Sequence, residues 1–295
     1  MLTVFLQFLL SGLTVGAVYA LVGMGFNIIY NATSVINLAQ GEFVVIGGLM
    51  MWFFTESVKL PFFVSIFLTL LTAGIVGLLM ERLTIRPLKN KDLLLMIMIT
   101  ISDSIVLRGL LMFKFGKDSY SYSPFTEGEP ISICGAIIQQ QALWVLGVTA
   151  LCIVLLFLFF SKTLTGKAMK ACSVDSTAAK LVGINVSQMV MLSFIFSAVV
   201  GAIGGIAITP ISLMEYDRGP MLAVKGFCAA IMGGLGRGRG AVLGGLLIGI
   251  LESMTAGYLN SGFKDALALL ILLLVLFFKP SGIFGSSAAA RLRKF

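Results

Sequence analysis

Long apolar runs alternate with short polar connections along almost the whole chain. A bilayer core about 30 Å thick takes roughly 20 residues of helix to cross. The pattern therefore predicts an all-α, polytopic transmembrane helix bundle with eight or nine hydrophobic segments, and it leaves the parity of the crossings open. The segments are 4–29, 43–57, 61–80, 92–113, 140–161, 188–209, 222–235, 241–259 and 263–278.

Helices are expected because lipid leaves no partner for an unpaired backbone, and because the runs lack the alternation of a barrel strand. Two of them, 43–57 and 222–235, are short for a full crossing. We expect these two to be re-entrant or broken. No stretch is long and polar enough to form a second domain, so residues 1–295 are interpreted as a single transmembrane domain.

The polar connections predict the orientation of the segments. Cations gather in 81–91 and 162–187, which we expect to be cytoplasmic by the positive-inside rule. Arg237 and Arg239 place a third loop on that side, and the tail with Arg291, Arg293 and Lys294 joins them. The connection 114–139 carries tyrosine, proline and glutamate, and is predicted to be an extracytoplasmic loop.

Composition supports the membrane class and excludes several others. Hydrophobic residues make up 58% of the chain and charged residues 12%, whereas a soluble domain is near half apolar and a quarter charged. The net charge of +8 is explained by cytoplasmic loops, so no nucleic-acid partner is expected. There is no histidine, and the four cysteines show no metal-binding spacing. We therefore expect no catalytic residues and no metal site.

Polar residues within apolar segments are the candidates for a solute path, because such groups are costly at membrane depth unless they are paired or hydrated. The stretch 37–42 is a candidate break where backbone groups can line a cavity. The alternative is that the two glutamates cap helix ends or pair across helices. The candidate residues are Asn27, Asn37, Gln40, Glu42 and Glu252.

Asp103 and Arg108 also lie within an apolar run. They are five residues apart, about 140° around a helix, so they do not share a face. Each is expected to find a partner elsewhere in the bundle, with snorkelling as the alternative for Arg108.

The connection 162–187 is predicted to contain a short cytoplasmic helix. Thr165 is a candidate N-cap and Gly183 a candidate C-terminal cap. Met169, Cys172 and Ala179 recur on one side and form a small-residue face suited to docking on a partner. An ordinary amphipathic surface helix is the alternative.

Glycine pairs at the spacing small-xxx-small predict close contacts between helix backbones. Gly12/Gly16, Gly201/Gly205 and Gly245/Gly249 have this spacing.

Several spaced motifs, in the same order along nearly the whole chain, resemble those of permeases from the branched-chain amino-acid class of ABC importers. The second motif has Leu38 and Gln40 where that family has Phe and His. Asp103 and Arg108 also depart from the family, which commonly has small or amide residues there. The motifs are Gly12-Leu-Thr-Val-Gly-Ala-Val-Tyr-Ala20, Val35-Ile-Asn-Leu-Ala-Gln-Gly-Glu-Phe43, Glu81-Arg82 with Arg86-Pro87, 166–185, 225–236 with 240–245, and 279–285.

The resemblance implies a permease in a prokaryotic plasma or inner membrane. Such permeases pair with a second, related permease, as a homodimer or heterodimer, with two cytoplasmic ATPases and with an extracytoplasmic solute-binding protein. The loop 162–187 would be the helix that couples to an ATPase. The residues implied in that role are Gly166, Lys167, Met169, Lys170, Cys172, Asp175, Leu181 and Gly183.

The chain contains no G-x-x-x-x-G-K-[ST] sequence, so it supplies no Walker-type ATP site. ATP and Mg are expected on the partner subunits, and this chain is expected to hold no cofactor. The expected solutes are branched-chain amino acids or similar small polar molecules, with urea or short amides as the alternative. An ion-coupled transporter would have internal repeats, and a membrane enzyme would need a nucleophile–base pair; neither feature is found.

Overall fold

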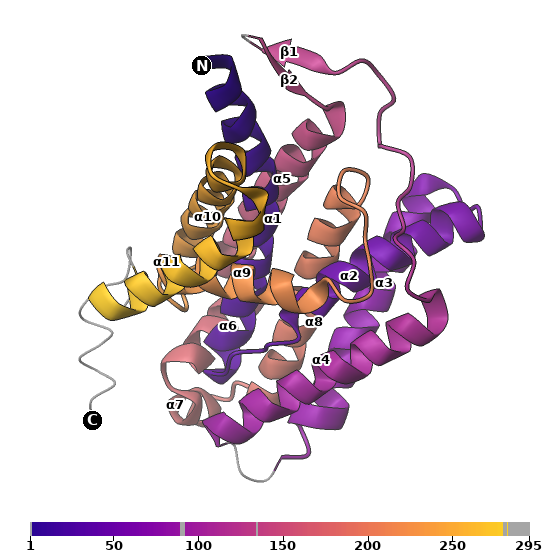
Figure 1. The fold of residues 1–295 in the computed structure, drawn as a ribbon. Coiled ribbons are helices and arrows are strands. Elements are labelled where there is room, and N and C mark those ends of the chain that lie inside the picture. The colour runs from indigo at the N-terminus through magenta and orange to yellow at the C-terminus, as the bar shows by residue number, and fades with distance from the viewer. Residues whose placement is uncertain (1, 89–91, 134, 280–281, 283–295) are drawn as a thin grey trace.

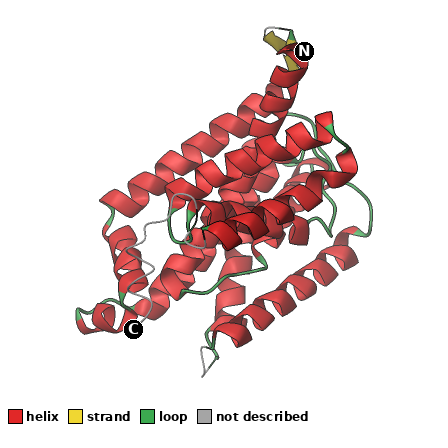
Figure 2. Cartoon of the chain, turned by 60° about the vertical axis from the view of Figure 1, so that its left-hand side comes forward, coloured by secondary structure: helices red, strands yellow, loops and turns green. Residues whose placement is uncertain are grey.

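The computed structural model describes residues 2–88, 92–133, 135–279 and 282, and it is almost entirely helical (Figures 1 and 2). Each of the nine predicted apolar segments forms a helix, which confirms the all-α membrane bundle. These helices are α1 (Leu2–Thr33), α2 (Gln40–Trp52), α3 (Phe62–Met80), α4 (Leu93–Phe115), α5 (Gln140–Lys162), α8 (Val186–Ile208), α9 (Gly219–Gly233), α10 (Gly238–Tyr258) and α11 (Lys264–Phe278).

Short elements extend or connect these helices. Two small helices, α6 (Leu164–Val174) and α7 (Ser176–Leu181), lie between α5 and α8. The connection 114–139 contains a hairpin of β1 (Ile131–Ile133) and β2 (Ala136–Ile138), in which Ile131 pairs with Ile138. The remaining elements are the single turns η1 (Phe53–Ser57), η2 (Glu81–Ile85) and η3 (Ser261–Phe263).

Among the described residues, seven helical stretches are long and apolar enough to cross a membrane. The helix α9 is shorter, with 15 residues, or about 22 Å at 1.5 Å per residue, so the prediction that the segment 222–235 is short for a full crossing is confirmed. The helix α2 has 13 residues but continues directly into η1, so the segment 43–57 is helical to Ser57, and its predicted shortness stays a prediction. The predicted cytoplasmic tail, with Arg291, Arg293 and Lys294, and the cations at 89–91 lie outside the described residues.

The side of the N-terminus, which the sequence left open, follows from two hydrogen bonds. Gln7 Nε2 donates to Ile137 O at 2.8 Å, and Ile137 N donates to Gln7 Oε1 at 2.7 Å. The first turns of α1 thus lie against the hairpin of the 114–139 connection, as Figures 1 and 2 show. The N-terminus therefore lies on the same side as the 114–139 connection, for which the positive-inside rule predicts the outer side of the membrane.

The helices α1 and α10 are in backbone-to-backbone contact. A Cβ atom added at Gly16 would meet Gly245 O, and one added at Gly249 would meet the Cα atom of Gly16. Because these contacts involve backbone atoms, a larger side chain cannot be accommodated by a change of rotamer. The predicted close approach at the Gly12/Gly16 and Gly245/Gly249 pairs is confirmed.

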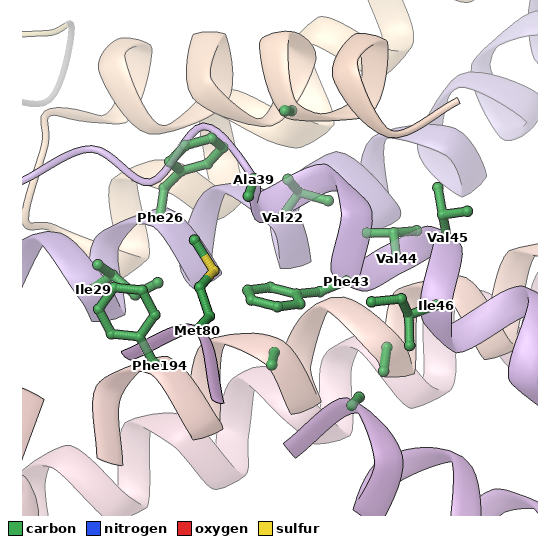
Figure 3. Packing of buried hydrophobic residues seen from close by; sticks show 14 of the residues in the cluster. Val22, Phe26, Ile29, Ala39, Phe43, Val44, Val45, Ile46, Met80 and Phe194 are labelled. Atoms are coloured by element: carbon green, nitrogen blue, oxygen red, sulfur yellow. The ribbon is translucent and has the colours of Figure 1, made fainter. Parts of the chain in front are cut away.

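The second close contact joins α8 to α2. A Cβ atom at Gly205 would meet Val44 O, and one at Gly47 would meet the backbone of Ala202. Phe43 packs beside this contact, while Phe194 lies further along α8, next to Ile29 (Figure 3). The helix α8 is consequently the most enclosed of the long helices.

The chain between α1 and α2 turns back into the bundle. Residues 34–39 are not helical, and α2 begins at Gln40. The Gln40 side chain contacts Gly25, which lies eight residues before Thr33, or about 12 Å of helix. The expected break is confirmed at 37–39, whereas 40–42 form the first turn of α2.

The start of α9 lies directly beside the start of α2. A Cβ atom at Gly41 would meet Gly219 O, and both glycines are buried. Two short helices therefore begin next to each other inside the protein, with their N-terminal, electropositive ends adjacent.

Candidate functional site

The predicted cytoplasmic helix is a pair of helices separated by Asp175. Thr163 is the N-cap of α6, because its Oγ1 accepts from Gly166 N at 3.0 Å. The expectation that Thr165 is the cap was wrong, since Thr165 lies inside α6. Asp175 Oδ1 accepts from Thr177 N and Ala178 N, at 2.8 and 3.0 Å, and so caps α7.

The helix α7 ends where the sequence predicted. Gly183 has a φ of +86°, a left-handed conformation that favours glycine. Gly183 N donates to Lys180 O, and Ile184 N donates to Ala179 O. This pair of bonds is a Schellman motif, and it confirms Gly183 as the C-terminal cap.

The small-residue face of the pair is turned towards the protein's own bundle. Met169, Cys172 and Ala179 are buried, and a Cβ atom at Gly166 would meet Phe159 O at the end of α5. The prediction that this face is free for a partner was wrong, because the helical spacing marks a buried stripe without identifying what covers it.

The opposite side of the helix pair is apolar and exposed. The exposed apolar side chains are Leu164, Val174, Leu181 and Val182, and Val174 is 88% exposed. Lys167, Lys170 and Asp175 are also exposed. The predicted coupling residues therefore fall into two groups. Gly166, Met169 and Cys172 are buried and hold the helix pair on the bundle. The exposed group consists of Lys167, Lys170, Asp175, Leu181 and Gly183.

Asn27 has its own hydrogen-bond partners, in the turn between α9 and α10. Its Oδ1 accepts from Gly236 N at 2.8 Å, and its Nδ2 donates to Arg237 O at 3.2 Å. One turn later, Asn31 Nδ2 donates to Gly236 O at 3.2 Å. Asn27 thus fixes the turn between α9 and α10.

Gln40 and Asn37 stabilise the start of α2. Gln40 Oε1 accepts from Ser197 Oγ at 2.6 Å, and Gln40 Nε2 donates to Ser197 O at 3.2 Å. Asn37 Oδ1 accepts from Ala39 N at 3.1 Å. Both side chains are buried, so they hold the break in its place against α8.

Glu42 connects the paired helix starts to α4. It lies in the first turn of α2, and its carboxylate packs against Gly219 at the first turn of α9. Ser104 Oγ donates to Glu42 Oε1 at 2.7 Å, and Arg108 Nε lies 3.8 Å from the same oxygen. The positive ends of two helices and one guanidinium therefore surround a fully buried carboxylate.

The partners expected for the charges on α4 are present. Arg108 forms its ion pair with Glu42, and Thr84 Oγ1 donates to Asp103 Oδ2 at 2.9 Å. As predicted, Asp103 and Arg108 contact different neighbours.

Glu252 belongs to a buried ion cluster that joins four helices. Lys225 Nζ lies 2.7 Å from Glu252 Oε1 and 2.7 Å from Asp265 Oδ1. Tyr19 OH donates to Glu252 Oε2 at 2.8 Å. These residues come from α9, α10, α11 and α1, so the alternative that Glu252 pairs across helices is confirmed.

A cavity of about 550 Å³ opens beside this cluster. Its walls carry Arg218, Lys225 and Lys264 together with Glu252 and Asp265. The remaining lining is largely apolar and includes Val15, Val18, Ile208, Met221 and Leu222. The cavity is therefore lined by positively and negatively charged side chains and by aliphatic side chains.

The sequence analysis did not identify Lys225, Asp265 or Tyr19 as site residues. Lys225 carried a usable signal, because it is a lone cation inside the apolar run 222–235. Asp265 lies at the edge of the apolar segment 263–278, and Tyr19 lies inside the glycine-containing segment 4–29. Neither position marks a site in the sequence, and the packing of α1, α9 and α11 brings these two residues to Lys225. Among the described residues, no group of His, Cys, Asp and Glu side chains is arranged to hold a metal ion.

The arrangement defines a polytopic, helical membrane protein with a charged internal cavity and a pair of short helices between α5 and α8. The overall fold is similar to that of PsaBC from Streptococcus pneumoniae in complex with Fab, with a TM-score of 0.51 and 15% identity over 99% of this chain and 100% of that chain.

The family model described as branched-chain amino acid transport system / permease component matches residues 8–278. The high-affinity branched-chain amino acid transport system permease protein BraD of Pseudomonas aeruginosa is 31% identical over 294 residues, which covers 95% of this chain and 96% of that protein. The permease protein LivH of Escherichia coli K12 is 30% identical over 297 residues, with the same coverage. The chain belongs to this family of permease components.

Proposed function

We propose that this protein is the membrane-spanning permease of an ATP-driven importer that carries branched-chain amino acids delivered by a binding protein. The observation that carries the proposal is membership of the permease family over residues 8–278. The relatives BraD and LivH are named as high-affinity branched-chain amino acid permeases, which favours these solutes over urea or short amides.

The partners follow from the same class. We expect a second related permease, two cytoplasmic ATPases that hold ATP and Mg, and an extracytoplasmic binding protein, assembled in the plasma or inner membrane of a prokaryote. The absence of a Walker sequence in the chain supports a separate ATPase.

The pair α6–α7 is the proposed contact with the ATPase. Val174, Leu181 and Val182 form an exposed apolar edge outside the spanning helices, and such an edge needs a partner. The buried face, with Gly166 against the end of α5, connects movement of the pair to the bundle. Closure of the ATPases would then tilt the spanning helices between outward- and inward-open states.

The cavity beside Glu252 is the proposed part of the solute path. An amino acid is a zwitterion, and Arg218 and Lys225 complement its carboxylate while Glu252 and Asp265 complement its ammonium group. The wall formed by Val18 and Leu222 suits a branched aliphatic side chain. Urea could form hydrogen bonds with these groups, but as a neutral molecule it would form no ion pair with them.

Uptake into proteoliposomes tests the proposal. The complex purified from its native cell, with its binding protein outside and ATP inside, should accumulate leucine, isoleucine or valine. Accumulation of urea alone would support the short-amide alternative. Uptake driven by an ion gradient without ATP would contradict the ABC assignment and direct attention to Glu42, Asp103 and Glu252 as coupling sites.

A further inference from the structure

The exposed face of α4 differs from those of the spanning helices α3, α5 and α11. The helix α3 contains no charged residue, and α5 and α11 carry charges only in their terminal turns. By contrast, Asp103 lies about 15 Å from the start of α4 and Arg108 about 10 Å from its end. Both side chains are partly exposed. Charges at this depth are costly in contact with lipid, so protein or water, rather than lipid, covers this face.

Neither of these charges is fully satisfied by the described part of the chain. The Asp103 carboxylate accepts a hydrogen bond from Thr84 Oγ1 at 2.9 Å and forms no ion pair with a described residue. Arg108 Nε lies 3.8 Å from Glu42 Oε1, and the Arg108 side chain is 33% exposed. This Nε has no hydrogen-bond partner among the described residues. The helix α4 can therefore bind an outside group of each sign.

The exposed residues between the two charges have the spacing of a helix–helix contact. They recur at alternating intervals of three and four residues, the heptad pattern that keeps one face against a partner helix. Ser102 and Gly109 are small and permit close approach of another helix. A Cβ atom added at Gly109 would have nothing within 4 Å. Gly147 on α5 is equally open, so the charges, and not the glycine, distinguish α4. We call this set the α4 seam, and it consists of Leu95, Met98, Ser102, Ile105, Gly109 and Met112.

Because the proposed function includes a second permease subunit, we propose that the α4 seam is this chain's contact with that subunit. A largely apolar seam with small residues suits a packed helix better than a water-filled channel. Asp103 and Arg108 lie on opposite flanks of the seam, about 100° from Ser102 in one direction and about 120° in the other. The partner helix therefore presents a cation on one flank and an acid on the other.

The charges of the seam are complementary to those of a second copy. In a twofold-symmetric pair with parallel α4 helices, Asp103 lies on the same flank as Arg108 of the partner subunit, about 7.5 Å away along the helix axis. The long arginine side chain can cover this distance. A second copy therefore fits the seam, and so does a related permease with charges of these signs at the same depth.

Photo-cross-linking from the seam tests the proposal in the complex purified from its native cell. A photoreactive amino acid would replace Ile105 of the seam or, as the matched control, Leu155 of α5; both side chains are 56% exposed. Mass spectrometry of the complex shows whether a related permease is present, and two differently tagged copies of the chain show whether it pairs with itself. Position 105 should give an adduct with that permease, and position 155 should give none.

Gly109→Leu should abolish the adduct from position 105, because the added side chain fills the seam. The control Gly147→Leu should leave the adduct unchanged. Both variants should keep the parent's Tm, since a Cβ atom at either position meets no atom within 4 Å. A second permease that is present but cross-links equally from position 155, or not at all from position 105, would overturn the proposed contact and leave the proposed function standing. A complex without a second permease or an ATPase would overturn both.

Discussion

The helices α10 and α4 attach to the bundle in opposite ways. Along α10, Gly245 and Gly249 place backbone directly against the backbone of α1. Along α4, Thr100, Ser104 and Arg108 face inward and contact α2 and the residues before it, with Thr100 Oγ1 accepting from Leu38 N at 3.3 Å. Met96, Leu111 and Phe115 of α4 are also buried, whereas most of its other side chains are exposed, and Phe113 is 93% exposed.

The difference separates a fixed part of the molecule from a part that can move. Backbone packing has one satisfactory geometry, because any shift opens a void or creates a clash. Hydroxyl and charged groups can exchange partners with one another or with water at small net cost. We therefore expect α1 and α10 to move as one body and α4 to shift against α2 during transport.

The largest loss of stability is expected from a bulky side chain placed in the contact between α1 and α10. Gly249→Leu would drive a side chain into the backbone of α1, and overpacking of this kind costs about 3 kcal/mol or more. We expect loss of the monodisperse peak in size-exclusion chromatography of the detergent-purified protein. Gly147→Leu on α5 is the control, because nothing lies within 4 Å of a Cβ atom added there. Equal damage from both variants would contradict the assignment of α1–α10 as the tight contact.

The next largest effect is expected at the ion cluster. Lys225→Met leaves Glu252 and Asp265 without their shared cation, and removing one member of a buried pair costs about 3–5 kcal/mol. We expect a lower Tm and loss of leucine uptake. Lys264→Met removes an exposed cation of the same cavity and should leave Tm unchanged. A Lys225 variant with the parent's Tm would show that the cluster does not hold the four helices together.

A smaller effect on stability is expected in the cytoplasmic pair. Asp175→Leu removes the cap of α7, at a cost of about 1 kcal/mol, and alters the surface proposed for the ATPase. We expect ATP hydrolysis to continue while uptake falls. Bulky replacement of Gly166 should have the same uncoupling effect. Asp118→Leu, in the 114–139 connection, is the control. Coupled transport at the parent's level in both the Asp175 and Gly166 variants would reject this role for the pair.

The smallest effect is expected on α4. Ser104→Ala removes one hydrogen bond to Glu42 and should lower the free energy of unfolding by about 1 kcal/mol. Ser102→Ala on the same helix, whose hydroxyl donates only to Met98 O, should change it less. Chemical denaturation in mixed micelles measures both. A Ser104 variant that unfolds the protein would place α4 in the fixed part of the molecule and remove the contrast with α10.

The spanning helices and their order could be predicted because membrane crossing depends on local hydrophobicity. The glycine contacts also followed from local spacing, at Gly16 and Gly249 for example. What covers a helix face could not be predicted from local spacing. Met169 and Cys172 were correctly predicted to lie on one face of the helix, but only the fold shows that α5 and the rest of the bundle cover this face.

The candidate solute path illustrates the same limit. Asn27, Gln40 and Glu252 look alike in the sequence, as polar groups among apolar ones. In the structure they serve the turn between α9 and α10, a helix start and an ion cluster, respectively. Partners such as Lys225 and Asp265 are 27 and 13 residues away from Glu252 in the chain, and helix packing rather than any local pattern brings them into contact.

Site-specific photo-cross-linking tests the central claim, that an ATPase drives this permease through the exposed edge of α6–α7. A photoreactive amino acid would replace Val174 or, as the control, Phe113, which is also apolar and exposed but lies near the end of α4 that leads into the 114–139 connection. After irradiation in the native cell, mass spectrometry identifies the adducts. The account predicts a Walker-motif ATPase cross-linked from position 174 and absent from position 113. No ATPase at 174, or the same yield from both positions, would contradict it.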